Sequence, residues 1–137
     1  MKRIESLLKE LWENREVAEG EADNAQIALD DLYYFSHDFS SRKAYKEYEN
    51  SLYADNEKAT GIVAMIDRRI LNIVKRHSDI EKRLSKLEKE LLDMCKYYDE
   101  VAAATTSVKV GNVEVLYFAY NDYGDFYFRL ESIRWFD

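Results

Sequence analysis

The sequence has few of the residues that interrupt helices or fix structure covalently. Its 137 residues include no proline, four glycines, one cysteine and two histidines. So few breakers exclude loop-rich folds and all-β folds that need a turn about every ten residues. A lone Cys95 excludes an internal disulfide framework, and His37 and His77 lie too far apart for paired zinc ligands. The absences therefore favour long helices.

Recognisable functional motifs are also missing. The sequence contains no glycine-rich phosphate loop, no nucleophile elbow and no cysteine–histidine pair at short spacing. We therefore assign no catalytic, cofactor-binding or metal-binding residues, and we expect a non-enzymatic protein without a cofactor. Acidic residues interrupt every apolar run near the start, which argues against a signal peptide or a membrane span.

Negative charge is what the chain has in excess, and it is unevenly distributed. Residues 1–38 carry ten acidic and four basic side chains, whereas residues 39–103 carry twelve acidic and thirteen basic ones. The formal net charge of −7 disfavours direct binding of nucleic acid, because phosphate groups require a clustered positive surface. It favours a protein, or a protein–nucleic acid complex, with a basic surface as partner.

A heptad pattern predicts a first helix over residues 2–34. Apolar or small residues alternate at spacings of three and four, with Arg15 as the one gap. They are Ile4, Leu8, Leu11, Ala18, Ala22, Ala25, Leu29 and Leu32. The middle of this seam uses only alanine, so a partner helix could approach closely there. The polar stretch that follows predicts a reversal, with Asp38, Ser40 or Ser41 as the cap of the next helix.

A second helix is predicted over residues 42–103, and its apolar seam is longer than the first helix can cover. A hairpin centred on Asp38 brings Ile4 opposite about residue 72, which leaves the later seam exposed to water. Either the carboxy-terminal segment or a second copy must cover it. We predict a coiled-coil homodimer or higher oligomer, with its interface at Ile73, His77, Ile80, Leu84, Leu87, Leu91, Met94 and Tyr98.

Two polar features of this helix allow alternative interpretations. His77 is a polar residue in the seam, which is typical of a residue that fixes register; a pH switch or a metal contact across a dimer axis is the alternative. A row of basic residues lies opposite the seam, at Arg68, Lys75, Lys82, Lys89 and Lys96. It is interpreted as a solvated ridge, with contact to phosphate or to an acidic partner as the alternative.

After residue 103 the pattern changes to that of strands. Valine-rich runs flank Gly111-Asn112, which predicts a two-residue hairpin turn between strands at 108–110 and 113–120. A second turn at 121–125 precedes a third strand at 126–135. The predicted fold class is therefore α+β: an antiparallel helical hairpin that extends into a coiled coil over residues 1–103, then a small antiparallel three-stranded meander over residues 104–137.

Both faces of the predicted meander are apolar, although one face is enough to rest on the helices. The other face is a candidate interaction surface, because aromatic residues and arginine dominate binding hot spots. The candidate partner-binding residues are Tyr117, Tyr120, Tyr123, Tyr127, Arg134 and Trp135. A role for these aromatic residues as the domain's own core is the alternative. Base stacking is disfavoured, because residues 104–137 carry five acidic and three basic side chains.

These observations predict a non-catalytic, oligomeric binding protein that acts as an inhibitor or adaptor. A structural coiled-coil scaffold is one alternative, and a ligand-binding protein or enzyme with a site between subunits is another. Small, acidic, tyrosine-rich chains without a catalytic motif resemble in a general way the accessory proteins of bacteriophages that block host machinery, including anti-defence inhibitors. That resemblance implies an inhibitory role in the host cytoplasm; without it we expect a cytoplasmic protein.

Overall fold

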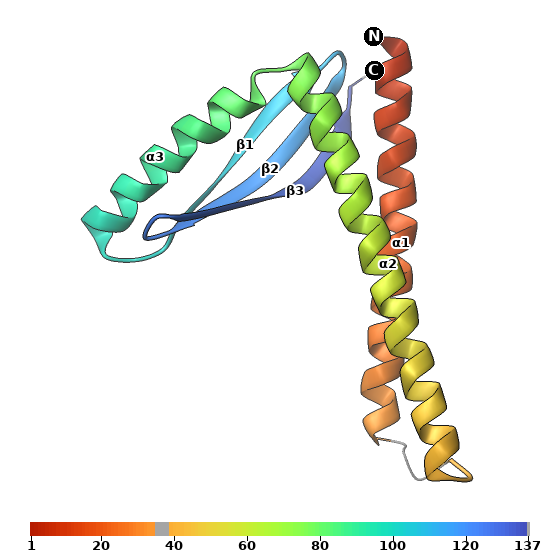
Figure 1. The fold of residues 1–137 in the computed structure, drawn as a ribbon. Coiled ribbons are helices and arrows are strands. Elements are labelled where there is room, and N and C mark those ends of the chain that lie inside the picture. Colours follow the sequence, from red (N-terminus) through yellow and green to blue (C-terminus); the bar gives the residue numbers. More distant parts are fainter. Residues whose placement is uncertain (35–38, 137) are drawn as a thin grey trace. The chain divides into compact units, whose positions relative to one another are not determined.

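The computed structural model describes residues 1–34 and 39–136 as three helices followed by three strands (Figure 1). The elements are α1 (Lys2–Tyr34), α2 (Arg42–His77), α3 (Ile80–Tyr98), β1 (Ala102–Val110), β2 (Val113–Asp122) and β3 (Asp125–Trp135). The strands form one antiparallel sheet in the order β1-β2-β3. This arrangement confirms the predicted α+β class with a carboxy-terminal meander.

The chain forms two compact units. One comprises residues 10–68, and the other comprises residues 1–9 together with residues 69–137. This division follows the packing of the helices rather than the boundary at residue 103 that the change of sequence pattern suggested, because α3 packs with the sheet. Each unit is described separately below.

The unit of residues 10–68 is an antiparallel pair formed by α1 and α2. The predicted seam of α1 is confirmed: its apolar members Leu11, Ala18, Ala22, Ala25, Leu29 and Leu32 are all buried. Leu52, Ala59 and Ile66 are the buried apolar residues of α2 in this unit. Ser41 caps α2, since its Oγ accepts a hydrogen bond from the backbone N–H of Ala44 at 3.1 Å. Asp38, another predicted cap, lies outside the described residues.

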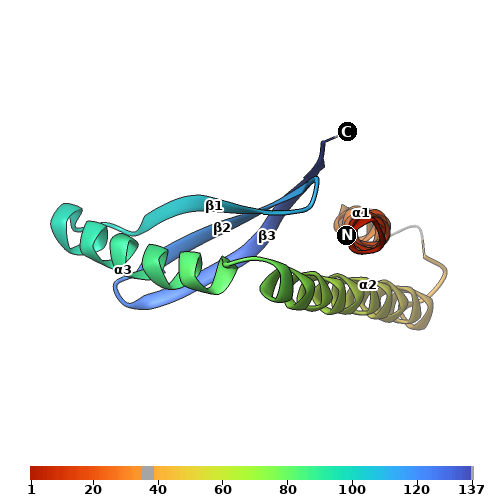
Figure 2. The ribbon, with the colours of Figure 1, turned by 90° about the horizontal axis from the view of Figure 1, so that it is seen from above.

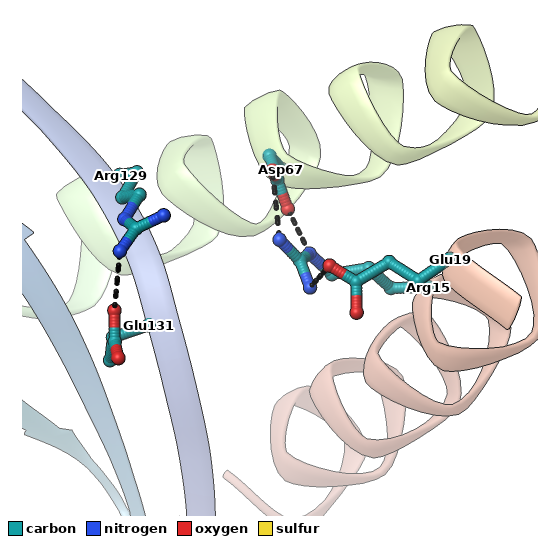
Figure 3. A network of polar contacts seen from close by, with 5 residues as sticks. All are labelled: Arg15, Glu19, Asp67, Arg129 and Glu131. Carbon is teal, nitrogen blue, oxygen red and sulfur yellow. Dashed lines mark hydrogen bonds and ion pairs between the residues drawn. The ribbon is translucent and has the colours of Figure 1, made fainter. Parts of the chain in front are cut away.

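Arg15, the gap in the apolar seam, is the centre of an ion-pair network (Figure 3). Its side chain is only 11% exposed; Nε donates to Asp67 Oδ1 at 2.5 Å and Nη1 donates to Glu19 Oε1 at 2.6 Å. The guanidinium also lies 5.2 Å from the ring centroid of Trp12. Burial alone would lower the pKa of Arg15, but its hydrogen bonds and charge interactions with Asp67 and Glu19 outweigh that effect and raise the pKa.

This network also shows that the helix register differs from the prediction. A hairpin centred on Asp38 pairs Arg15 with residue 61. In the structure Arg15 instead contacts Asp67, which lies about six residues further along α2. The Nδ2 of Asn56 donates to the carbonyl oxygen of Ala22 at 3.0 Å, which places a second contact nearer to the connection. Specific side-chain contacts thus set the register, and the midpoint of the turn does not.

In the other unit, the predicted continuous helix over residues 42–103 is wrong. The helix ends at His77, and α3 begins at Ile80. Between them, Ser78 Oγ donates to the carbonyl oxygen of Val74 at 2.6 Å and accepts from the backbone N–H of Ile80 at 3.3 Å. Serine side chains compete in this way for backbone groups that a continuous helix would pair internally. Asp79 forms no capping hydrogen bond, and its Oδ1 accepts from Arg83 Nε at 2.8 Å instead. His77 is therefore an exposed helix-terminal residue.

The break allows α3 to lie along the sheet (Figures 1 and 2). Leu91 and Cys95 of α3 form a core cluster with Ala102 of β1 and Ala119 of β2. The helix ends at Tyr98, because Asp99 adopts a left-handed backbone conformation with φ of 53°, and β1 therefore begins six residues earlier than predicted. The sheet, rather than a second copy, covers the apolar side of α3.

Several residues predicted to form an oligomer interface are therefore core residues of the single chain. Ile80, Leu84 and Leu91 are buried, and Ile73 and Leu87 are half-buried. Of the two coverings considered for this seam, the carboxy-terminal segment is the one observed, because the sheet packs on it. Of the predicted interface, His77, Met94 and Tyr98 are exposed. Self-association stays a prediction.

We expect Arg15→Ala to lower the free energy of unfolding by about 2 kcal/mol, because it leaves the Asp67 carboxylate partly buried without its cation. Urea denaturation followed by circular dichroism measures this change. Glu16→Ala, an exposed position on the same helix, is the control and should change the stability by about 0.5 kcal/mol or less. Equal stability of both variants would show that the network contributes nothing measurable.

Candidate functional site

The two faces of the sheet have different environments. The side of the sheet on which α3 packs is called the inner face. The β2 residues that point to the inner face are all buried: Val113, Val115, Tyr117, Ala119 and Asn121. The opposite side, to which the alternate residues of each strand point, is called the outer face. On β2 these are Glu114, Leu116, Phe118, Tyr120 and Asp122, which are half-buried or exposed.

The structure separates the six predicted partner-binding residues into three groups. Tyr120, Tyr127 and Arg134 lie on the outer face and are exposed, and Tyr123 lies exposed in the β2–β3 turn. Tyr117 is only 1% exposed and packs edge-on against Phe128, so its assignment as a partner-binding residue is wrong. Trp135 also belongs to the inner side, opposite Val113, and is half-buried. Strand alternation alone could not separate these two residues from those of the outer face, because both faces of the strands are apolar in sequence; for Trp135, binding stays a prediction.

Aromatic rings form a continuous cluster on the outer face. Tyr120 and Tyr127 face each other on neighbouring strands, with ring centroids 5.1 Å apart and planes 25° apart. They are 37% and 52% exposed. Phe118 extends the cluster along β2, with its ring centroid 6.4 Å from that of Tyr120, and the Arg129 guanidinium lies 5.1 Å from the Phe118 ring centroid. The stacked tyrosines thus present a flat aromatic surface to solvent.

The charges of the outer face are distributed along the strands. Arg134 forms an ion pair with Glu114 at 3.9 Å, and Arg129 forms one with Glu131 at 3.7 Å (Figure 3). Both cations therefore have a carboxylate beside them. Asp122 and Asp125 face each other at the other end, next to the tyrosines, and neither forms an ion pair within the described residues. The uncompensated charge next to the aromatic surface is therefore negative.

Hydrogen bonds to Asp99 and to Asn121 hold the β2–β3 turn that carries these carboxylates. Tyr123 and Gly124 both have positive φ, of 53° and 115°, as a type I′ turn requires. The Tyr123 hydroxyl donates to Asp99 Oδ1 at 3.3 Å. Partial desolvation and the neighbouring Asp99 carboxylate raise the pKa of Tyr123.

Asn121 is the buried residue that anchors this turn, and sequence reasoning missed it. Its side chain is fully buried; Nδ2 donates to the carbonyl oxygen of Glu88 on α3 at 3.1 Å, and Oδ1 accepts from the backbone N–H of Gly124 at 2.7 Å. The Cys95 thiol donates to the Asn121 carbonyl oxygen at 3.0 Å. Alternation along β2 was the available signal, since it places an amide on the apolar side of the strand.

Comparisons with known proteins add no relative: no family model, no curated protein and no solved structure matches this chain. None of the described helices combines the length and apolar character that crossing a membrane requires. Within residues 1–34 and 39–136, no group of three or more histidine, cysteine, aspartate or glutamate side chains is placed to hold a metal ion.

We expect Asn121→Asp to lower the free energy of unfolding by about 3 kcal/mol at neutral pH, because a buried carboxylate cannot donate to Glu88 and is poorly solvated. Asn112→Asp makes the same change in the exposed β1–β2 turn and is the matched control. The difference between the two variants should shrink at acidic pH, where a protonated carboxyl can donate again. Denaturant titrations at both pH values measure it, and similar stability of the variants at neutral pH would contradict the anchoring role.

Proposed function

We propose that this protein is a non-catalytic inhibitor or adaptor that docks on a partner protein with a basic surface through the outer face of its sheet. The observation that carries the proposal is the exposed stack of Tyr120 and Tyr127 beside two carboxylates, Asp122 and Asp125, that lack ion-pair partners within the described residues. Aromatic area supplies apolar contact, and the carboxylates supply charge complementarity.

The chemistry of this surface suits arginine and lysine side chains. The faces of tyrosine rings attract cations, and a carboxylate beside the ring adds a charge-assisted hydrogen bond. Tyrosine also loses little conformational entropy on binding, which is one reason for its frequency at interface hot spots. A partner that inserts arginine or lysine beside Tyr120 would therefore satisfy both kinds of group.

A nucleic acid fits the same surface less well. Base stacking on the aromatic rings would bring phosphates toward Asp122 and Asp125, which repel them. The two arginines of the outer face could attract phosphate only after separating from Glu114 and Glu131. The overall charge of −7 adds repulsion at longer range. A basic protein is thus the better match to the described charges.

We expect the double substitution Tyr120→Ala/Tyr127→Ala to weaken binding of the partner by at least about 30-fold, as loss of hot-spot aromatic residues usually does. The partner is first captured from lysate on immobilised wild-type protein and identified by mass spectrometry. Its affinity for each variant is then measured by calorimetry with purified components. Asp122→Asn/Asp125→Asn should weaken the complex less, and should make its affinity less dependent on salt concentration.

Tyr97→Ala is the control, because Tyr97 is an exposed aromatic residue of α3 outside the outer face. It should leave the affinity unchanged, and circular dichroism should show that every variant is folded. A captured protein that binds the Tyr120→Ala/Tyr127→Ala variant as tightly as wild type would contradict this proposal. A partner whose contact surface is acidic would contradict the charge argument.

A further inference from the structure

One aromatic ring of the outer face already holds a cation from its own chain. Phe118 lies directly opposite Arg129 on β3, and the guanidinium lies 5.1 Å from the ring centroid. Glu131 completes the arrangement, because its carboxylate forms an ion pair with the same guanidinium at 3.7 Å (Figure 3). A ring, a guanidinium and a carboxylate therefore form one group on this face.

Arg15 forms the same kind of group in the unit of residues 10–68. Its guanidinium lies 5.2 Å from the ring centroid of Trp12, and Asp67 and Glu19 accept its hydrogen bonds. A guanidinium suits such a group, because its flat face can stack on a ring while its in-plane N–H groups reach a carboxylate. The chain thus uses a ring and a carboxylate together to hold arginine at two places.

The next row of the outer face has the ring and the carboxylates without the cation. Tyr120 lies two residues after Phe118 on β2, and Asp122 lies two residues further on the same face. Asp122 faces Asp125, and neither carboxylate has an ion-pair partner in the part of the chain that the structure describes. Both arginines of the outer face already have other carboxylates beside them. A cation that completes this row therefore comes from another molecule.

One face of the Tyr120 ring is open to such a cation. The Tyr127 ring covers the other face from β3, with ring centroids 5.1 Å apart and planes 25° apart. On the β1 side, the residue opposite Tyr120 is Ala103, which is exposed and has no side-chain atom beyond Cβ with which to cover the ring. A flat cationic group can therefore lie against Tyr120, above Ala103.

We propose that Tyr120 and Asp122 form a receptor for one arginine side chain of the partner protein. The guanidinium stacks on the open face of Tyr120 above Ala103, and its N–H groups donate to the Asp122 carboxylate. Lysine fits less well, because its compact, strongly hydrated ammonium cannot stack flat on a ring and donate two parallel hydrogen bonds to a carboxylate. This inference rests on the proposed function, since it names the side chain by which the basic partner is held.

Two short peptides, acetyl-Gly-Arg-Gly-amide and acetyl-Gly-Lys-Gly-amide, test this preference on the full chain. Titration of the isotope-labelled chain, followed by nuclear magnetic resonance, should show millimolar binding of the arginine peptide with shifts centred on the amides of Ala103, Tyr120 and Asp122. The arginine peptide should bind at least about threefold more tightly than the lysine peptide. Equal affinities would overturn the inference, and so would a titration in which these amides do not shift.

Ala103→Leu tests the stacking position, because leucine covers the open face of Tyr120 and leaves every carboxylate in place. It should weaken binding of the arginine peptide by at least about threefold. Thr105→Leu is the matched control: it adds the same side chain opposite Phe118, the ring that Arg129 already occupies, and should leave the affinity unchanged. Both positions are exposed on β1, and circular dichroism checks that both variants fold. A folded Ala103→Leu variant that binds the arginine peptide as wild type does would overturn the inference.

Asp122→Asn should remove most of the preference for the arginine peptide, because the charged acceptor of the paired hydrogen bonds is lost. Asp93→Asn makes the same change of charge at an exposed position of α3 and should keep the preference. The two proposals fail in different ways. A captured partner that binds Tyr120→Ala/Tyr127→Ala as tightly as wild type overturns both. If that variant binds the partner weakly while the two peptides bind wild type equally, only the arginine receptor is overturned.

Discussion

The packing of α3 on the inner face of the sheet is the contact on which the carboxy-terminal part of this protein depends. Three antiparallel strands are barely stable alone, and a helix with one apolar side cannot leave that side in water. Leu91 and Cys95 pack against Ala102 and Ala119, and this contact both stabilises the sheet and buries the apolar side of α3. The small alanines allow the helix to approach closely, and Asn121 hydrogen-bonds to α3 within the same contact.

This contact also determines which surfaces are left for other molecules. Once α3 covers the inner face, the alternate side chains of each strand stay exposed on the outer face, and Tyr120 and Tyr127 meet there. The proposed function rests on this outer face.

The helical pair of residues 10–68 uses a polar contact where its apolar seam is interrupted. Alanines at Ala18, Ala22 and Ala25 leave little side-chain volume to define one register, whereas the hydrogen bonds of Arg15 to Asp67 have a fixed geometry. A residue that looked like a defect in the heptad pattern is therefore a specific contact. The register that this contact sets could not be derived from the position of the turn.

The sequence by itself determined the class of the fold, most of its buried positions and both hairpin turns. These follow from local physics: the spacing of apolar residues reports which side of an element is buried, and Gly111 and Gly124 report backbone conformations with positive φ. The break after His77 was hidden, because the spacing of three and four continues through Ser78 and Asp79 while their side chains bond locally.

Only the tertiary structure decided what covers each apolar surface. The pattern of α3 is the same whether a second helix or a sheet packs on it, since the hydrophobic effect is not directional. For the same reason the sequence could not separate buried Tyr117 from exposed Tyr120, which lie on opposite faces of one strand. Burial is decided by the arrangement of all elements together, and the side of β2 on which α3 packs made one tyrosine a core residue and left the other in solvent.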